Sequence, residues 1–416
     1  MIFGINTIDD YEIKGKTVLC RIDINQPVDK SKDILKSTAR IEACVPTIRE
    51  LSDKGAKLVL LAHQGSDIEY HNFYTTRPHS RVLSELLGRE VKFIPDVCGP
   101  AAVSAIKELK EGEILLLDNV RFMSEEQTIF EKSLKLSPEE QTKTVLVEKL
   151  APLGDLYVCD AFAAAHRNQP SLCAFEQLMP SAMGRLFEKE YQVLSELMEK
   201  PEHPCVFVLG GAKVADAFLM METVLAAETA DVILTGGLVG NIMLASQGIE
   251  IGQGSLSFIE KSGYGEYIEK SKEIYKKYGE KIELPFDIAY VRDGKRYEAV
   301  ANEIPSDISA VDIGENTKKR YQEIIRNAKT VFVNGPMGVF EEAASEEGTR
   351  GVWEALGDTK AFTVVGGGDS ITATAKYDKR DKISYICTGG GALIQFLSGK
   401  EMPVIKALRD GAQKFK

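Results

Sequence analysis

The sequence predicts an α/β protein with two doubly wound lobes of parallel sheet, joined by a hinge helix. Short apolar runs alternate with longer amphipathic stretches along the whole 416-residue chain. Such runs are typical of parallel strands that helices cover on both faces, as in Rossmann-like folds. The chain is too long for one core, and two sheets of ordinary size fit the number of runs better than one very large sheet.

The elements follow in order from this alternation. Strands are predicted at residues 17–23, 57–63, 91–94, 113–119 and 155–160, and in the second half of the chain at 205–209, 231–234, 330–334, 362–365 and 383–386. Apolar residues at helical spacing predict helices at residues 39–55, 76–87, 142–150 and 345–355. Residues 252–265, rich in glycine and serine, are expected to form a surface loop of the second lobe.

A domain boundary is predicted near the middle of the chain. In residues 184–200, leucine and phenylalanine recur at helical spacing with charges between them, and Pro201 and Pro204 end the pattern. We therefore expect an N-terminal lobe of residues 1–184, a connecting helix at 185–200 and a C-terminal lobe of residues 201–403.

Composition narrows the possible function classes. The net charge of −11 disfavours a broad nucleic-acid surface. The sequence has no apolar run of about 18 residues, and its first residues do not resemble a secretion signal, so we expect a cytoplasmic protein without a membrane partner. The seven cysteines are scattered without a C-x-x-C pair, which disfavours a disulfide framework and a cysteine metal site.

Polar and basic residues follow the predicted strands of the first lobe. Ligands of doubly wound sheets bind at the carboxyl ends of the strands. Guanidinium groups that share one rim repel each other unless an anion is bound, so this pattern predicts a phosphate or carboxylate ligand. The alternative is a set of solvated surface charges. The arginines expected at this edge are Arg21, Arg40, Arg121 and Arg167.

Glycine clusters follow the predicted strands of the second lobe. Glycine lets backbone N–H groups approach an anion closely, and Lys213, just after one cluster, supplies a charge suited to phosphate. Asp369 can help to hold Mg²⁺, which needs only one or two carboxylates. The set predicts a nucleotide site without a Walker A motif, although each cluster alone is more often a tight turn. The clusters lie at residues 210–211, 236–237, 335–338, 366–368 and 389–391.

Together these motifs resemble one family, the phosphoglycerate kinases. The resemblance covers essentially the full chain, and the Ala-His-Gln-Gly sequence is most similar to archaeal members. The motifs that carry it are RIDINQP at 21–27, RIEACVPTI at 40–48, GAKLVLLAHQG at 55–65, LLLDNVRF at 115–122, GDLYVCDAFAAAHR at 154–167, LGGAKVAD at 209–216, NGPMGVFE at 334–341, VVGGGDS at 364–370 and TGGGA at 388–392.

The resemblance implies a glycolytic and gluconeogenic kinase that transfers a phosphoryl group between 1,3-bisphosphoglycerate and ADP, giving 3-phosphoglycerate and ATP. It implies that the first lobe binds the acid and that the second binds ATP or ADP with Mg²⁺. It further implies closure about the connecting helix, and a final segment that packs on the first lobe, for which the amphipathic residues 404–416 are suitable. The expected partners are therefore small molecules.

Carried over by motif, the resemblance assigns residues to three roles. Those facing phosphoglycerate would be Asp23, Asn25, Arg40, His63, Gln64, Gly65, Ser66, Arg121, His166 and Arg167. Those holding the nucleotide would be Gly211, Gly237, Asn334, Pro336, Glu341, Gly367, Gly368, Asp369 and Ser370, with Asp369 at the metal. Those around the phosphoryl group during transfer would be Arg40, Lys213, Gly368 and Gly391.

The chain departs from the family pattern at three places. Ser66 stands where an arginine is usual, and Arg77 is a candidate replacement for that cation. Ala217 stands where many members have a second lysine, and Ala163 and Ala164 replace a Gly-Thr pair.

These departures leave two alternatives open. The change at Ser66 permits a related kinase that phosphorylates another small carboxylate. A sensor that binds nucleotide or phosphoglycerate without catalysis is the other alternative, and it is disfavoured because Arg40, Lys213 and Asp369 are all present.

Overall fold

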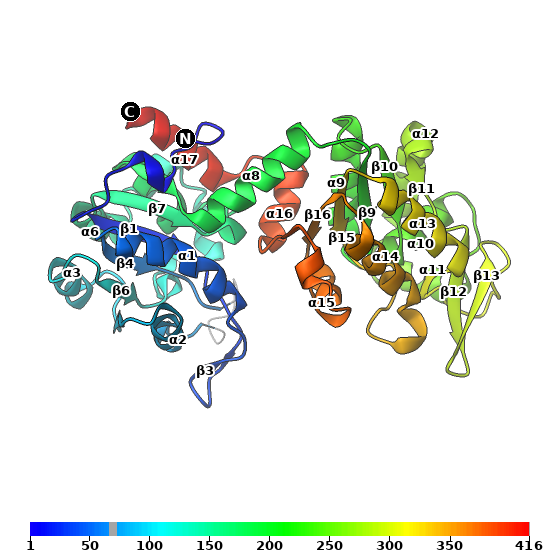
Figure 1. Cartoon of the computed structure of the whole chain (residues 1–416), viewed down its shortest axis with the longest axis horizontal. Coiled ribbons are helices and arrows are strands. Elements are labelled where there is room, and N and C mark those ends of the chain that lie inside the picture. Colours follow the sequence, from blue (N-terminus) through cyan, green and yellow to red (C-terminus); the bar gives the residue numbers. More distant parts are fainter. Residues whose placement is uncertain (66–72, 416) are drawn as a thin grey trace. The chain divides into compact units, whose positions relative to one another are not determined.

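The structure, a computed structural model, describes residues 1–65 and 73–415. It divides into two compact units. Unit 1 comprises Met1–Gln192 and Glu401–Lys416, and unit 2 comprises Val193–Lys400. Within the described residues each unit contains a six-stranded parallel sheet flanked by helices (Figure 1). The predicted α/β fold with two parallel sheets is therefore confirmed.

The sheet of unit 1 has the strand order β5-β6-β4-β1-β7-β8. Its strands are β1 (Thr17–Ile22), β4 (Lys57–Leu61), β5 (Val91–Ile94), β6 (Ile114–Leu117), β7 (Leu156–Asp160) and β8 (Ser181–Met183). A small antiparallel hairpin joins β2 (Val28–Asp29) and β3 (Ile34–Leu35). The helices that begin in this unit are α1 (Ala39–Asp53), α2 (Arg77–Leu87), α3 (Pro100–Lys107), α4 (Thr128–Leu134), α5 (Pro138–Gln141), α6 (Val145–Leu150), α7 (Pro170–Cys173), α8 (Arg185–Glu199) and α17 (Pro403–Lys414).

Alternate residues of β1 face opposite sides of this sheet, as strand geometry requires. Cys20 and Ile22 belong to a buried apolar cluster that also holds Ile48 of α1 and Leu83 of α2. Arg21, between them, points to the opposite side and contacts α7. Because both faces are covered, nearly every strand residue is buried, which explains the continuous apolar runs in the sequence.

The sheet of unit 2 has the strand order β11-β10-β9-β15-β16-β17, and a separate antiparallel sheet has the order β13-β12-β14. The strands are β9 (Cys205–Leu209), β10 (Val232–Thr235), β11 (Ile282–Glu283), β12 (Asp287–Arg292), β13 (Lys295–Val300), β14 (Asp312–Ile313), β15 (Thr330–Asn334), β16 (Phe362–Gly366) and β17 (Tyr385–Ile386). The helices are α9 (Val214–Ala226), α10 (Gly237–Ser246), α11 (Gln253–Lys261), α12 (Glu266–Tyr278), α13 (Glu315–Asn327), α14 (Glu347–Asp358), α15 (Gly368–Lys376) and α16 (Gly390–Leu397).

The prediction of a surface loop at residues 252–265 is wrong. Helix α11 occupies most of this stretch, because Ser255 and Ile259, one helical turn apart, are both buried. The Ser255 hydroxyl accepts a hydrogen bond from the backbone N–H of Ala310 at 2.8 Å, which ties the helix to the loop before β14. The glycine and serine content concealed this helical spacing.

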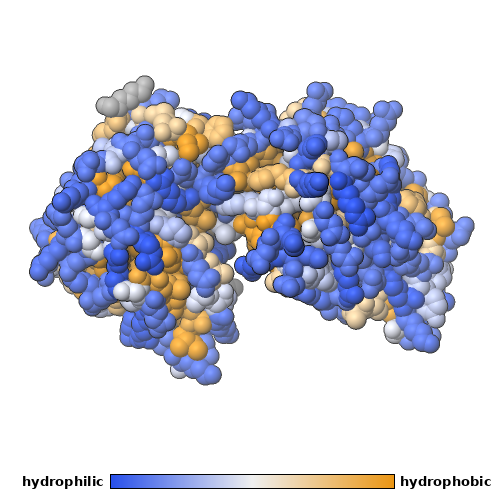
Figure 2. All heavy atoms as spheres, viewed as in Figure 1, coloured by the Kyte–Doolittle hydropathy of each residue, from blue (hydrophilic) through white to orange (hydrophobic). Residues whose placement is uncertain are grey.

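Strands β12 and β13 were not predicted. Most of β13 is exposed or half-buried, and its polar sequence lacks the continuous apolar run that marks a strand covered on both faces. Figure 2 shows that polar residues cover most of the visible surface of both units, with apolar residues in scattered patches. No described helix is long and apolar enough to cross a membrane.

Helix α17 packs within unit 1 although it follows unit 2 in the sequence. The backbone N–H of Val404 donates to the carbonyl of Ala165 at 3.2 Å, and the Lys414 ammonium donates to the carbonyl of Gln177 at 2.8 Å. Leu408, on the apolar face of α17, is fully buried. The helix thus belongs to the same compact unit as the first strands of the chain (Figure 1).

A buried carboxylate caps the first turn of α8. Asp160, the last residue of β7, accepts hydrogen bonds from the backbone N–H groups of Leu186 at 2.9 Å and Phe187 at 3.1 Å. A Cβ atom on Gly184 would lie 2.3 Å from the Asp160 carboxylate oxygen, so only glycine fits at the start of this helix. Burial raises the pKa of Asp160 to about 7, with the capping hydrogen bonds opposing the shift.

We expect the Asp160→Asn variant to lose a pH dependence of stability that the parent chain has. The folded state holds the Asp160 proton up to about pH 7, whereas the unfolded chain releases it near pH 4. The free energy of unfolding therefore falls as pH rises from 4 to 7, by up to about 4 kcal/mol. Asparagine keeps an oxygen acceptor for both N–H groups but does not titrate. Urea unfolding of both proteins between pH 4 and 8 measures the two slopes, and equal slopes would contradict the expectation.

Candidate active site

A polar cavity of about 220 Å³ lies at the carboxyl edge of the unit 1 sheet. The turns after β1, β4, β6 and β7 all contribute to it, and α1 contributes its second residue, Arg40. Because parallel strands end at the same edge, residues from four distant parts of the sequence converge here. The residues that line the cavity are Asp23, Asn25, Arg40, His63, Gly65, Arg121, Ala163, Ala164, His166, Arg167 and Gln169.

Three guanidinium groups line this cavity together. Arg40 Nη1 lies 2.5 Å from Asp23 Oδ2, and Asp23 is only 4% exposed whereas the Arg40 side chain is 39% exposed. Arg121 is nearly buried and donates to the carbonyl of Gly65. Arg167 donates to the Thr128 hydroxyl at 3.1 Å. Asp23 is the one carboxylate among the described residues that line the cavity, so this part of the cavity is suited to an anion.

Amide side chains hold the cavity floor in place. Asn25 Oδ1 accepts from the backbone N–H of Gly65 at 2.9 Å, and its amide nitrogen donates to the Gly65 carbonyl at 3.3 Å. Asn119 makes the same two-bond exchange with the backbone of Gln64, at 3.0 and 2.7 Å. These pairs join the turns after β1, β4 and β6 into one rigid edge.

Gln64 does not line the cavity, although the sequence placed it among the substrate-facing residues. Its side chain is buried and exchanges two hydrogen bonds with the backbone of Gln26, at 3.1 and 2.8 Å. His79 Nε2, on α2, lies 2.9 Å from the side-chain amide oxygen (Oε1) of Gln64. Gln64 therefore supports the turn that carries His63 and Gly65 rather than facing a ligand.

Arg21 is likewise absent from the rim where the sequence placed it. Its side chain is fully buried on the α7 side of the sheet, below the turn that carries His63. Arg77, considered as a replacement for the cation missing at residue 66, does not line the cavity, and its guanidinium lies over the ring of Phe93. Ser66 itself lies outside the described residues.

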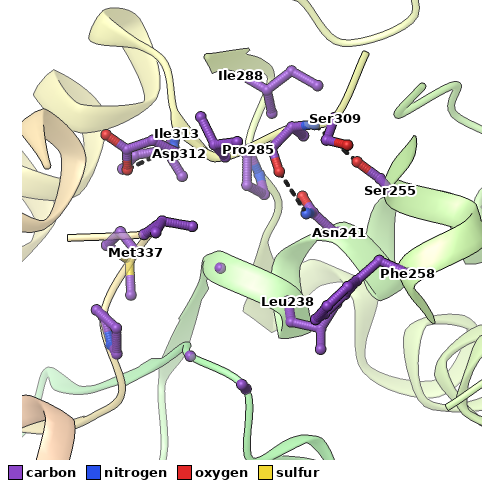
Figure 3. Close-up of a pocket in the computed structure, with 18 of the residues that line it drawn as sticks. Leu238, Asn241, Ser255, Phe258, Pro285, Ile288, Ser309, Asp312, Ile313 and Met337 are labelled. Carbon is purple, nitrogen blue, oxygen red and sulfur yellow. Dashed lines mark hydrogen bonds between the residues drawn. The ribbon is translucent and has the colours of Figure 1, made fainter. Parts of the chain in front are cut away.

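Unit 2 contains a more apolar cavity of about 390 Å³. Figure 3 shows Leu238 and Phe258 side by side on one wall and Pro285 and Ile288 on another, with the Asn241 amide directed at the loop before β14. That amide donates to the carbonyl of Ala310 at 3.2 Å. Of the predicted nucleotide residues, this cavity is lined by Gly211, Gly237, Pro336, Glu341 and Asp369.

The backbone segments that follow β9 and β15 pack closely against each other and form the floor of this cavity. The N–H of Gly211 donates to the carbonyl of Pro336 at 2.8 Å. Gly335 has a φ of +94°, and a Cβ atom there would lie 2.1 Å from the carbonyl oxygen of Gly210, so glycine is required. Ser370, also buried, accepts from the N–H of Gly335 at 2.7 Å and so fixes the start of α15 against β15.

A shallow recess adjoins this floor at the N-termini of α9 and α15. Lys213 is exposed and immediately precedes α9, and Gly367, Gly368 and Asp369 line the facing side. A Cβ atom on Gly368 would meet nothing within 4 Å, so the packing of the protein does not require glycine at this position. Open space in front of a helix N-terminus leaves its N–H groups free to bind an anion. The other predicted residues in this recess are Asn334, Ser370 and Gly211, which also lines the larger cavity.

Sequence reasoning missed much of the larger cavity. Its walls include residues of α11, the segment after α12 and the loop before β14, none of which carries a strand-end glycine cluster. Gln169 of the unit 1 cavity was also missed, since it follows the His-Arg motif without any charge of its own.

Gly391, predicted at the transferring group, lies in the first turn of α16 and lines neither cavity nor the recess.

Comparisons with known proteins are consistent across the whole chain. The sequence matches the family model described as "Phosphoglycerate kinase" over residues 8–400. It is 45% identical over 408 residues to the phosphoglycerate kinase of Methanothermobacter thermautotrophicus, covering 98% of this chain and 97% of that one. It is 43% identical over 413 residues to that of Thermococcus kodakarensis, covering 98% of each. The solved phosphoglycerate kinase of Pyrococcus horikoshii superposes with a TM-score of 0.87 at 40% identity, covering 99% of this chain and 100% of that one.

Proposed function

Because this chain belongs to the phosphoglycerate kinase family, we propose how its own residues carry out the reaction of that family. The enzyme transfers a phosphoryl group between 1,3-bisphosphoglycerate and ADP and yields 3-phosphoglycerate and ATP, a step of glycolysis and gluconeogenesis. The observation that carries the residue assignment is the convergence of three arginines and two histidines on one polar cavity of unit 1.

Unit 1 binds the acid in that cavity. The guanidiniums of Arg40, Arg121 and Arg167 neutralise the phosphate and carboxylate of phosphoglycerate. Asn25 supports the cavity from the turn after β1, and Asp23 orients Arg40. The volume of about 220 Å³ suits a small acid rather than a nucleotide.

Unit 2 binds ATP or ADP. The apolar walls of its larger cavity, with Phe258 and Leu238, suit a nucleobase. The exposed carboxylate of Glu341, on the loop after β15, is placed to accept hydrogen bonds from ribose hydroxyls. The phosphates bind in the adjoining recess, where Lys213 and the N-terminus of α15 supply positive charge.

Asp369 holds the Mg²⁺ that accompanies the nucleotide. It is exposed in the first turn of α15 and borders both the larger cavity and the recess. No group of three or more His, Cys, Asp or Glu residues in the described chain is arranged to hold a metal alone. One carboxylate together with phosphate oxygens and waters fits the way Mg²⁺ is usually bound with nucleotides, and the bound ion would neutralise phosphate charge.

The chemistry needs no general base from the protein. The acceptor in ATP-consuming turnover is the carboxylate of 3-phosphoglycerate, which is already ionised at neutral pH. Catalysis then depends on aligning two anions and on placing cations and N–H donors around the transferring group. The residues around both predicted ligands, rich in guanidinium and backbone N–H groups, match that requirement.

The proposal is tested by direct assay of the full chain. Purified protein given 1,3-bisphosphoglycerate and MgADP is expected to form ATP at a rate far above that of a Lys213→Ala variant prepared in parallel. A panel of other small carboxylates with MgATP tests the substrate class. ATP formation no faster than in the variant, or faster turnover with another acid, would overturn the proposal.

A further inference from the structure

Arg21 makes a set of contacts that have no role in the proposed phosphoryl transfer. The side chain lies in β1 and is fully buried. Its Nε donates to the hydroxyl of Ser171 at 3.0 Å, and its Nη1 donates to the carbonyl of Ile22 at 2.6 Å. Its Nη2 lies 3.0 Å from Nδ1 of His63, the histidine that follows β4 and lines the unit 1 cavity.

The contact between Arg21 and His63 has only one possible direction. A guanidinium carries five N–H donors and no acceptor, so Nδ1 of His63 must be the acceptor. A neutral imidazole that accepts at Nδ1 carries its proton on Nε2. Among the described residues Nε2 has no hydrogen-bond partner, and the ring borders the cavity. We infer that Arg21 fixes His63 as the neutral Nε2–H tautomer and so gives the unit 1 cavity a fixed hydrogen-bond donor for the bound acid.

The charges around His63 favour the same neutral form. Burial is the largest cause that lowers the pKa of His63 well below its ordinary value of 6.5. The cations that act in the same direction come from the turn after β6, from β1, from α1 and from the turn after β7, namely Arg121, Arg21, Arg40 and Arg167. A neutral ring avoids adding another charge to this group and still donates one hydrogen bond.

A buried carboxylate anchors Arg21 in this position. Glu126 is fully buried, and its two oxygens accept from the backbone N–H of Ser171 at 2.6 Å and from the Ser171 hydroxyl at 2.7 Å. The Ser171 hydroxyl donates its one proton to Glu126 and so is left to accept from Arg21 Nε. The hydrogen-bonded series Glu126–Ser171–Arg21–His63 is therefore consistent in every donor and acceptor. Burial raises the pKa of Glu126, whereas the hydrogen bonds from Ser171 and the positive charge of Arg21 oppose this shift and favour the ionised carboxylate.

The alternative tautomer would oppose binding. With the proton on Nδ1, the ring would present an Nε2 lone pair to the carboxylate or phosphate oxygens of the acid, and two acceptors repel. Arg21 thus acts as a positioning residue through His63 and touches no substrate itself. The inference rests on the proposed function only for the identity of the acid. The state of His63 can be measured without any turnover.

The first test is nitrogen-15 NMR of the full, ligand-free chain. The chain has five histidines, so the ring nitrogens of His63 can be assigned by comparison with a His63→Gln variant. We expect a protonated Nε2 and an unprotonated Nδ1, unchanged between pH 6 and 8. A protonated Nδ1, or titration of the ring within this range, would overturn the inference even if the enzyme is fully active.

The second test compares a double variant that keeps the buried charges balanced with two single variants, because Arg21→Met alone leaves Glu126 without its cation. In R21M/E126Q we expect the NMR signature of the Nε2–H tautomer to be lost and the KM for 3-phosphoglycerate to rise about tenfold, with kcat changed by less than about threefold. E126Q alone, which keeps the Arg21 contact, and R21K, which keeps a donor to Nδ1, are expected to retain the tautomer. A wild-type tautomer in the double variant would overturn the inference, whereas failure of all variants and the parent chain to make ATP would overturn the proposed function instead.

Discussion

Replacement of Arg40 by alanine is expected to lower kcat by about 10²- to 10⁴-fold, the range found when one charged group that stabilises a transferring phosphoryl group or an oxyanion is removed. Arg40 is the most favourably placed cation of unit 1 because Asp23, at 2.5 Å, fixes its orientation while 39% of its side chain remains accessible. Asp23 is nearly buried and cannot turn away, so the guanidinium is held in place before substrate binds.

The same helix supplies a matched control for this prediction. Arg49, about two and a half turns further along α1, donates to the carbonyls of Leu86 and Leu87 and does not line the cavity. We expect Arg49→Ala to keep kcat within about twofold, since loss of such peripheral contacts costs only about 1 kcal/mol of stability. Initial rates at saturating 3-phosphoglycerate and MgATP measure both variants. A decrease of less than tenfold for Arg40→Ala would remove Arg40 from the transfer step.

The Lys213→Ala variant is expected to lose about 10²- to 10³-fold in kcat, with a smaller change in the KM for nucleotide. Lys213 is exposed in the recess formed with Gly367, Gly368 and Asp369, where the phosphates of the nucleotide are proposed to bind. Its flexible stem lets the ammonium follow a phosphate that changes position during transfer.

Helix α9 offers no substitute for this lysine. Ala217, one turn further along the helix, is 1% exposed and packs into the interior of unit 2. Lys329, exposed directly before β15, is a suitable control because it lies outside the cavity and the recess. Steady-state kinetics of Lys213→Ala and Lys329→Ala distinguish a specific role from a general loss of positive charge, and equal effects of the two substitutions would argue against the assignment.

Much of the candidate site could be predicted from the sequence because parallel sheets gather their strand ends at one edge. Asp23, His63, Arg121 and Arg167 follow four different strands and do line one cavity. The role of Gln64 could not be predicted, since a glutamine beside a glycine turn is equally suited to bind a ligand or the neighbouring backbone. Its hydrogen bonds to Gln26 and the contact of His79 depend on the packing of α2.

The residues that form the walls of the larger cavity also could not be predicted from the sequence. Phe258 lies on α11, in a stretch whose glycines and serines favoured a loop, and Pro285 follows the short strand β11. Pro285 lies two residues before β12, which pairs with β14, and Ala310, before β14, donates to Ser255 of α11. These contacts join residues that no local pattern connects.

By itself, the sequence determined the two parallel sheets and the identity of most residues at their carboxyl edges, because burial on both faces leaves a continuous apolar run and a polar residue marks its end. It did not determine which face each strand residue occupies, since both faces of such a strand are equally apolar. Only the tertiary structure decided that Arg21 points away from the rim, where Ser171 and Glu126 hold it beneath His63. The physical reason is the two-residue period of the strand, which sends Arg21 to the opposite face from Cys20 and Ile22.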